Sequence, residues 1–193
     1  MVQLTGSKKI KTAVFISGNG TNLKSLIKFS KLEKAPISIN LIISDNLKSK
    51  GLKYGKLFKI KTKIINFKNK RLAEKRTISI LKKSEIKFIC LAGFMQILSK
   101  QFIKKFKEKI LNIHPSLLPK FKGLNTHQRA IDNNEKYSGC TVHFVNSKLD
   151  SGKIILQKKI KIKKNDNKYK LAKRVLKEEH ELYPKAILKI FNL

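Results

Sequence analysis

Apolar and polar positions follow two rhythms along this chain, one typical of strands and one typical of helices. Short apolar runs rich in β-branched residues predict buried strands, and they lie at 12–17, 37–44, 62–67, 88–91 and 110–113. Apolar residues recur at helical spacing between these runs. This spacing predicts helices at about 23–29, 47–58, 70–85 and 99–106.

The last third of the chain continues the pattern with longer elements. We predict a short helix at 126–133, two strands at 139–144 and 154–162, and a long helix from about 167 to 191. Pro184 lies inside this last segment. We expect it to kink or split the helix, because proline lacks a backbone N–H.

Strands that alternate with helices predict an α/β fold. Right-handed crossovers make successive strands parallel and place helices on both faces of the sheet. We therefore expect a single domain over residues 1–193, with a mostly parallel, twisted, Rossmann-like sheet and antiparallel strands near the C-terminal third. Residues 1–11 are polar and basic with no apolar segment behind them, so we expect a short N-terminal extension and not a signal peptide.

The chain carries a large positive charge. Its 193 residues include 45 Lys and Arg against 12 Asp and Glu, a formal net charge of +33. One interpretation is a nucleic-acid binder held by phosphate contacts. Only four of the basic residues are Arg, however, and the lysines are spread over almost every segment. We therefore favour compositional drift from an AT-rich coding sequence, expect no specific nucleic-acid partner, and expect anionic ligands to be attracted in a salt-dependent way.

Two other classes of protein are not indicated. The chain has no run of 18 or more apolar residues that could form a membrane span. Cys90 and Cys140 lie in apolar runs without the CxxC or CxxH spacing of a zinc site, and they do not suggest a disulfide framework. We therefore expect a cytoplasmic protein with no membrane partner and no metal.

The stretch from Leu111 to Pro119 concentrates the candidate chemistry. Pro115 ends the predicted strand, and Asn112 and His114 are two residues apart, so both side chains point to the same face. An amide can donate to a developing oxyanion, and an imidazole can move a proton near neutral pH. The alternative is structural, with an asparagine that ends a strand and a half-buried histidine bonded to a carbonyl.

Three loops with candidate chemistry each follow a predicted strand, at 18–22, 93–98 and 114–123. The carboxyl ends of parallel strands gather ligands at one edge of the sheet, so we expect these loops to lie together. The first loop joins a strand to a helix through two glycines, which suits phosphate binding by backbone N–H groups. The alternative is a plain turn capped by Thr21.

Asp150 lies in a turn-rich loop between the two late strands. A carboxylate beside an imidazole favours the protonated ring and fixes its orientation. Asn112, His114 and Asp150 would then supply an oxyanion donor, a proton carrier and an electrostatic partner, which suits formyl, acyl or carbamoyl transfer to an amine. No Ser or Cys is obviously paired with His114, so direct transfer is favoured. The remaining histidines are interpreted as core or capping residues: His127, His143 and His180.

These residues resemble the folate-dependent formyltransferase family. The stretch NIHPSLLP at 112–119, together with Asp150, is shared across that family. Four further stretches narrow the resemblance to the branch that formylates glycinamide ribonucleotide in purine biosynthesis with 10-formyltetrahydrofolate. They are SGNGTNL at 17–23, AGFM at 92–95, GLNTH at 123–127 and EEHELYP at 178–184.

The resemblance implies a role for each matching residue. The catalytic residues would be Asn112, His114 and Asp150. The phosphate of glycinamide ribonucleotide would lie on Gly20, Thr21 and Asn22, and its ribose against Glu179. The folate would contact Met95, Gln96, Ile97, Leu98 and Asn112, with Lys70 near its acidic tail. Two positions depart from the family pattern, where relatives commonly carry Arg in place of Gln96 and often His in place of Asn125.

The implied reaction is attack of the substrate amine on the formyl carbon. Asn112 and protonated His114 would stabilise the oxyanion, and His114 with a water would pass the proton to the departing folate nitrogen. The alternatives are a sister enzyme acting on methionyl-tRNA or a sugar amine, a formyltetrahydrofolate hydrolase, or a basic nucleic-acid-binding protein on this scaffold. The absence of a second domain and of an N-terminal regulatory domain argues against the tRNA enzyme and the hydrolase. Small-molecule substrates and a monomer or weak homodimer are expected.

Overall fold

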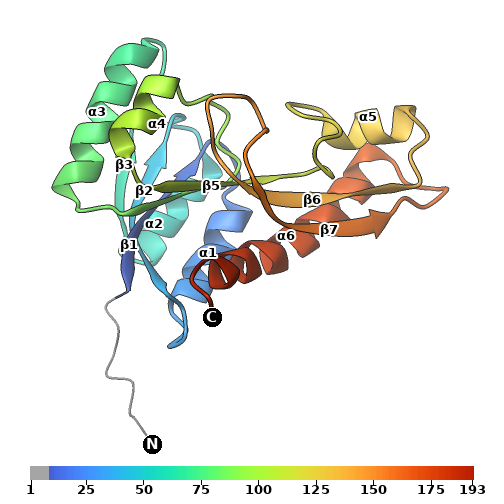
Figure 1. The fold of residues 1–193 in the computed structure, drawn as a ribbon, viewed down its shortest axis with the longest axis horizontal. Coiled ribbons are helices and arrows are strands. Elements are labelled where there is room, and N and C mark those ends of the chain that lie inside the picture. The colour runs from blue at the N-terminus through green and yellow to red at the C-terminus, as the bar shows by residue number, and fades with distance from the viewer. Residues whose placement is uncertain (1–8) are drawn as a thin grey trace, which may run out of the picture.

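The computed structural model describes residues 9–193, which form a sheet between two layers of helices (Figure 1). The sheet has the strand order β3-β2-β1-β4-β5-β6-β7. Its strands are β1 (Ile10–Ile16), β2 (Ile37–Ser44), β3 (Lys61–Ile64), β4 (Phe88–Leu91), β5 (Lys109–His114), β6 (Tyr137–Phe144) and β7 (Ile154–Lys161). The helices are α1 (Thr21–Ser30), the 3-10 turn η1 (Lys50–Leu52), α2 (Lys53–Leu57), α3 (Lys70–Lys83), α4 (Lys100–Phe106), α5 (Thr126–Asp132) and α6 (Lys168–Ile190).

The sheet is parallel from β3 to β5 and antiparallel from β5 to β7. This arrangement confirms the predicted α/β class and the antiparallel strands of the C-terminal third. β5 is the strand at which the direction changes, because it pairs with β4 on one side and with β6 on the other. Asn112 and His114 therefore lie on the strand that joins the two halves of the sheet.

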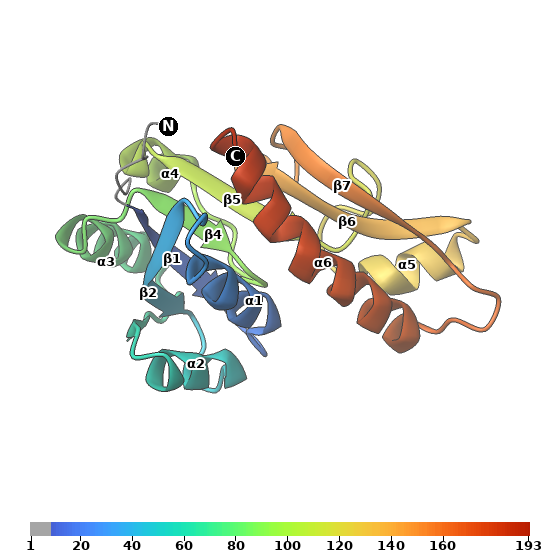
Figure 2. The ribbon, with the colours of Figure 1, turned by 90° about the horizontal axis from the view of Figure 1, so that it is seen from below.

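Alternate residues of the central strands feed two separate apolar cores. Ala13 and Phe15 of β1 pack in the core that contains Phe102 and other side chains of α3 and α4. Val14 and Ile16 pack in the opposite core, with side chains of α1 and α6. Figure 1 shows α3 and α4 above the sheet, and Figure 2 shows α1 and α6 side by side across its other face.

Several predicted elements begin or end at other residues than expected. The backbone N–H of Ile10 donates to the carbonyl of Pro36 at 2.9 Å, and Ile10 pairs with Ile37 of β2, so the strand begins within the predicted N-terminal extension. Residues 1–8 of that extension lie outside the described residues. β3 ends at Ile64, short of the predicted Phe67, although the N–H of Ile65 still donates to the carbonyl of Ser44 at 2.8 Å. The helix predicted at 47–58 is reduced to η1 and α2.

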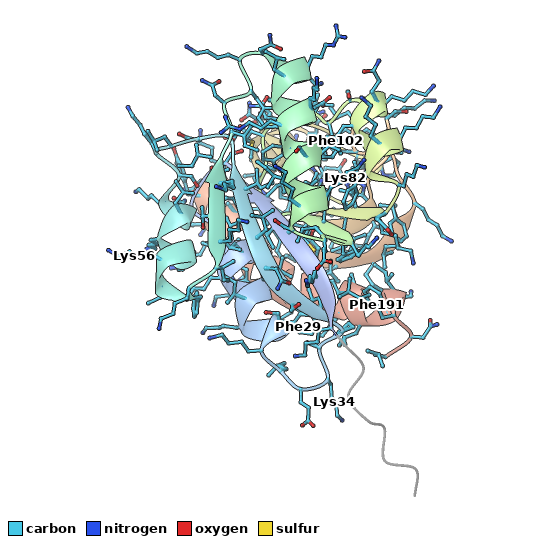
Figure 3. All side chains as sticks on the ribbon, turned by 90° about the vertical axis from the view of Figure 1, so that its left-hand side faces the viewer. Phe29, Lys34, Lys56, Lys82, Phe102 and Phe191 are labelled. Carbon is cyan, nitrogen blue, oxygen red and sulfur yellow. The ribbon has the colours of Figure 1, made fainter. Side chains whose placement is uncertain are left out.

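The positive charge lies on the surface. Figure 3 shows basic side chains, including Lys56 and Lys82, extending outward from α2 and α3. Lysines also line both edge strands, at Lys61 and Lys63 of β3 and at 158–159 and 161 of β7, where they are exposed. Lysine on an edge strand discourages pairing with another chain.

Helix α6 runs unbroken through Pro184, so of the predicted kink or split the split does not occur. Proline at this position leaves the carbonyl of His180 without its helical N–H donor. The hydroxyl of Ser25 on α1 donates to that carbonyl at 2.8 Å and replaces the missing bond. The packing of α1 against α6 therefore provides the hydrogen-bond donor that Pro184 removes from the helix.

We predict that the stability provided by Ser25 depends on Pro184. Ser25→Ala should lower the free energy of unfolding by about 1 kcal/mol in the natural chain, and by much less when combined with Pro184→Ala, which restores the helical donor. A double-mutant cycle measured by urea unfolding tests this coupling.

Ser30→Ala is the matched control, because the Ser30 hydroxyl donates at 2.8 Å to the carbonyl of Ile27 within its own helix. Its cost should be the same in both backgrounds. Equal costs for Ser25→Ala in the two backgrounds would contradict the proposed replacement.

Candidate active site

The carboxyl ends of the parallel strands open into a cavity of about 940 Å³, a size that fits a drug-sized ligand. The three loops expected at one edge of the sheet meet there, since the cavity is lined by Asn22, by 93–98, and by His114 with Gly123. The loop between β6 and β7, which lies above the sheet in Figure 1, adds Asp150. The predicted convergence of loops is confirmed.

His114 is buried between two acceptors. Its Nε2 lies 2.9 Å from the carbonyl oxygen of Phe121 and its Nδ1 lies 3.4 Å from an Asp150 carboxylate oxygen. A carbonyl and a carboxylate can only accept, so a ring protonated on both nitrogens satisfies both neighbours. The two acceptors therefore fix the orientation of the imidazole ring.

Asp150 is held by backbone geometry as well as by charge. The N–H of Gly123 donates to its Oδ2 at 2.9 Å. Asp150 itself has a φ of 43°, in the left-handed region that most side chains avoid. Two residues later, a Cβ on Gly152 would overlap the carbonyl oxygen of Phe144, so only glycine allows the loop to return this closely to β6.

Asn112 is oriented by His143, which lies opposite it in the β5–β6 pairing. His143 Nδ1 lies 2.8 Å from the carbonyl of Phe144 and must carry the hydrogen of that bond. Burial lowers the pKa of His143, so the ring is neutral and its Nε2 accepts from Asn112 Nδ2 at 3.2 Å. The second hydrogen of that amide faces Asp150 Oδ1 at 3.5 Å, a weak contact.

The sequence interpretation of His143 as a core residue was incomplete. The side chain is buried, but it contacts Asn112 and lies 3.7 Å from Asp150. The position of His143 opposite Asn112 depends on the register of β6 against β5, and no local pattern in the sequence reveals that register. His127 was also underestimated, because it lines the cavity, and its buried Nδ1 has no hydrogen-bond partner among the described residues.

The glycine loop leads into an uncapped helix. Gly20 has a φ of 71° and is the N-cap of α1, where no side chain caps the helix. The predicted alternative of a Thr21 cap is therefore not observed. A Cβ on Gly20 would come within 2.6 Å of Gly51, so the loop packs glycine against glycine. The first helical bond runs from Lys24 to Gly20, which leaves the preceding N–H groups free of helical acceptors.

Asn22 and Glu179 form a buried pair beside this loop. Asn22 Nδ2 donates to Glu179 Oε2 at 2.6 Å, and both side chains line the cavity. Burial raises the pKa of Glu179 to about 7, and the hydrogen bond from Asn22 opposes this shift. Gly20 and Thr21 do not line the cavity, so of the predicted phosphate-binding residues only Asn22 does.

All the residues predicted to bind the folate line the cavity except Lys70. Met95 and Ile97 line the cavity with 61% and 55% of their surface exposed, and Leu98 lines it from a buried position. Gln96 also lines the cavity, and its amide donates to Asp45 Oδ2 at 2.7 Å. Lys70 begins α3 and does not line the cavity.

The Ser and Cys side chains considered as nucleophiles are either hydrogen-bonded to the backbone or buried. The hydroxyl of Ser116 donates to the carbonyl of Lys120 at 2.6 Å. Cys90 and Cys140 are free and buried, and burial raises the pKa of each thiol to about 12.

Within residues 9–193, no group of three or more His, Cys, Asp or Glu side chains is arranged to hold a metal ion. None of the helices in this part of the chain is long and apolar enough to cross a membrane.

Comparison with known proteins identifies close relatives. A family model described as formyl transferase matches residues 10–187. The phosphoribosylglycinamide formyltransferase of Haemophilus influenzae is 40% identical over 180 residues, which cover 92% of this chain and 85% of that protein. The crystal structure of phosphoribosylglycinamide formyltransferase from Brucella melitensis has a TM-score of 0.89 and 41% identity, and the match covers 95% of this chain and 96% of that one.

A larger relative is the human trifunctional purine biosynthetic protein adenosine-3. It is 40% identical over 183 residues, which cover 93% of this chain but only 18% of the human protein. The chain thus spans less than a fifth of the length of this trifunctional relative.

We predict that Glu179 makes stability fall as the pH rises. Its pKa in the folded protein is about 7, above its ordinary value of 4.5, so the unfolded chain releases this proton first and the free energy of unfolding declines between these two pH values. Glu179→Gln keeps an acceptor for Asn22 and stays neutral. At pH 8 it should be more stable than the natural chain by on the order of 1–3 kcal/mol, with little difference at pH 4.

Urea unfolding across this pH range measures the effect. Glu178→Gln is the control, because the neighbouring Glu178 faces Lys158 at 3.7 Å and is partly exposed. It should give no gain above pH 7. Parallel pH profiles for the natural chain and Glu179→Gln would contradict the prediction.

Proposed function

This chain belongs to the formyl transferase family, and we propose that it transfers a formyl group from 10-formyltetrahydrofolate to the amine of glycinamide ribonucleotide in purine biosynthesis. The observation that carries the proposal is the convergence of Asn112, His114 and Asp150 at one cavity. The names of the relatives give the acceptor, since they are phosphoribosylglycinamide formyltransferases.

In the proposed reaction, the substrate amine attacks the formyl carbon and creates a tetrahedral oxyanion. Asn112 donates to that oxygen with the amide hydrogen that Asp150 engages only weakly, at 3.5 Å. His143 holds the other hydrogen of the same amide and so fixes the direction of the donor. This division of the two hydrogens supports Asn112 as the oxyanion donor.

His114 is the proton carrier of the proposed mechanism. The doubly protonated ring has an acceptor at each nitrogen, so the site stabilises the positive charge that the oxyanion requires. Through a water molecule, His114 gives a ring proton to the departing folate nitrogen as its bond to the formyl carbon breaks, and the neutral ring then takes up the proton that the attacking amine loses. Asp150 acts through charge and orientation and forms no bond to the substrate.

We propose that the two substrates bind at the start of α1 and along the apolar lining of the cavity. We assign the phosphate of glycinamide ribonucleotide to Gly20, Thr21 and Asn22 at the start of α1, and its ribose hydroxyls to Glu179. We assign the pterin ring to the apolar surface of 95–98 and the loop of Asp150. The contact of Lys70 with the acidic tail of the folate stays a prediction.

The remaining expectations belong to the same proposal. We propose that residues 1–193 act as one formyltransferase domain on small molecules in the cytoplasm, as a monomer or weak homodimer, without a specific nucleic-acid partner. Gln96 is bonded to Asp45 and adds no positive charge where relatives commonly carry Arg. Folate recognition in this chain would then depend more on the apolar contacts.

We predict that the purified chain formylates glycinamide ribonucleotide in preference to other acceptors. A competition assay with 10-formyltetrahydrofolate should offer glycinamide ribonucleotide, methionyl-tRNA and water, and should follow each product separately. Turnover should require the ribonucleotide. Hydrolysis alone, or preferred formylation of the tRNA, would replace this proposal by one of the sister activities.

We predict that His114→Ala and Asp150→Asn reduce kcat by roughly 10²- to 10³-fold and change KM by less than about threefold. The reason is that both groups act on charge that develops after binding. Steady-state kinetics with each substrate varied in turn measures the two parameters.

Glu135→Gln is the control for removal of a carboxylate, because Glu135 pairs with Lys120 at 2.7 Å on the surface. It should leave both parameters unchanged. Full turnover in His114→Ala would overturn the assigned mechanism.

A further inference from the structure

The loop at 121–125 has an unfavourable backbone conformation. Phe121, Gly123 and Asn125 all lie in the left-handed region, with φ values of 55°, 77° and 56°. Glycine and asparagine tolerate this region, but a bulky aromatic residue rarely adopts it. Such strain persists only where surrounding contacts hold the backbone in place.

Two backbone groups of this loop touch the candidate catalytic residues. The carbonyl of Phe121 accepts from His114 Nε2 at 2.9 Å, and the N–H of Gly123 donates to Asp150 at 2.9 Å. The separation of the imidazole from the carboxylate is therefore set partly by the position of this loop. A loop that relaxed its strain would change both contacts together.

Arg129 on α5 is the side chain that restrains the loop. Its Nη1 donates to the carbonyl of Lys122 at 2.7 Å and lies 3.4 Å from the carbonyl of Leu124. The guanidinium carbon also lies 5.3 Å from the centre of the Phe121 ring, within the range of a cation–π contact. One side chain thus engages three residues of the strained segment.

We propose that Arg129 is a positioning residue, which fixes the geometry of His114 and Asp150 through the loop at 121–125. This inference rests on the proposed formyl transfer for its kinetic consequences but not for its structural ones. Arg129 itself is exposed and touches neither His114 nor Asp150 in any described contact. Its effect passes through the Phe121 carbonyl and the Gly123 N–H.

The chemistry of the guanidinium group suits this task better than a point charge would. Its planar fork donates in fixed directions to two carbonyls while its face lies against an aromatic ring, whereas the ammonium group of lysine is a compact charge on a flexible stem. Arg129→Lys should therefore keep the charge and lose most of the restraint. Arg129→Ala should lose all of it.

The test compares both variants with the natural chain in kcat and in KM for each substrate. Arg129→Ala should reduce kcat by roughly 10- to 50-fold, and Arg129→Lys by at least about threefold, with KM for both substrates within about twofold.

Amide hydrogen exchange of Gly123 provides a measurement that does not depend on activity. It should become faster in both variants, because a loosened loop breaks the bond to Asp150 more often. If the natural chain shows no formyl transfer but exchange still responds, the proposed function fails and the restraint stands.

Arg174→Ala is the matched control, because Arg174 likewise donates to a backbone carbonyl, that of Lys161 at 3.0 Å, away from the cavity. It should leave kcat, KM and Gly123 exchange unchanged. The inference is overturned by unchanged exchange and kcat in Arg129→Ala, by an effect confined to KM, or by full activity in Arg129→Lys. Should Arg129→Ala fail to fold, the same measurements on Arg129→Lys decide.

Discussion

A carboxylate placed beside an imidazole, both withdrawn from water, is the contact around which the site of this protein is arranged. The side chains of His114 and Asp150 are only 7% and 9% exposed. A buried charge is costly unless neighbouring groups satisfy it. That requirement explains why the N–H of Gly123 is directed at Asp150 and why the loop around it accepts a strained backbone. Antiparallel β6 brings both His143 and the loop of Asp150 back beside Asn112.

Much of this architecture could be predicted from the chain alone, because strands and helices have different apolar periods and parallel strands end at one edge. Features that depend on distant partners could not. His143 required the register of β5 against β6. The continuity of α6 required the hydroxyl of Ser25 on another helix. The contact of Gln96 with Asp45 joins loops that follow different strands. In each case the deciding interaction is tertiary, and local pattern carries no record of it.

Exposed and buried positions of the chain are subject to different physical constraints. Lysines occupy exposed positions on the helices and on both edge strands, where a substitution changes stability little. The apolar cores on either side of the sheet, and the polar contacts at its carboxyl edge, allow far less variation because buried groups need matching partners. A net charge of +33 is therefore compatible with a fold that matches the crystal structure of a relative with a TM-score of 0.89 at 41% identity.

The buried pair of Asn22 and Glu179 has a consequence for the energetics of ligand binding. A carboxyl that titrates near neutral pH inside a cavity exchanges protons with the solvent whenever a ligand changes its surroundings. Affinity and proton uptake are then reciprocal quantities. The heat of association measured by calorimetry would include the ionisation enthalpy of the buffer, and two buffers at one pH would return different apparent enthalpies for the same complex.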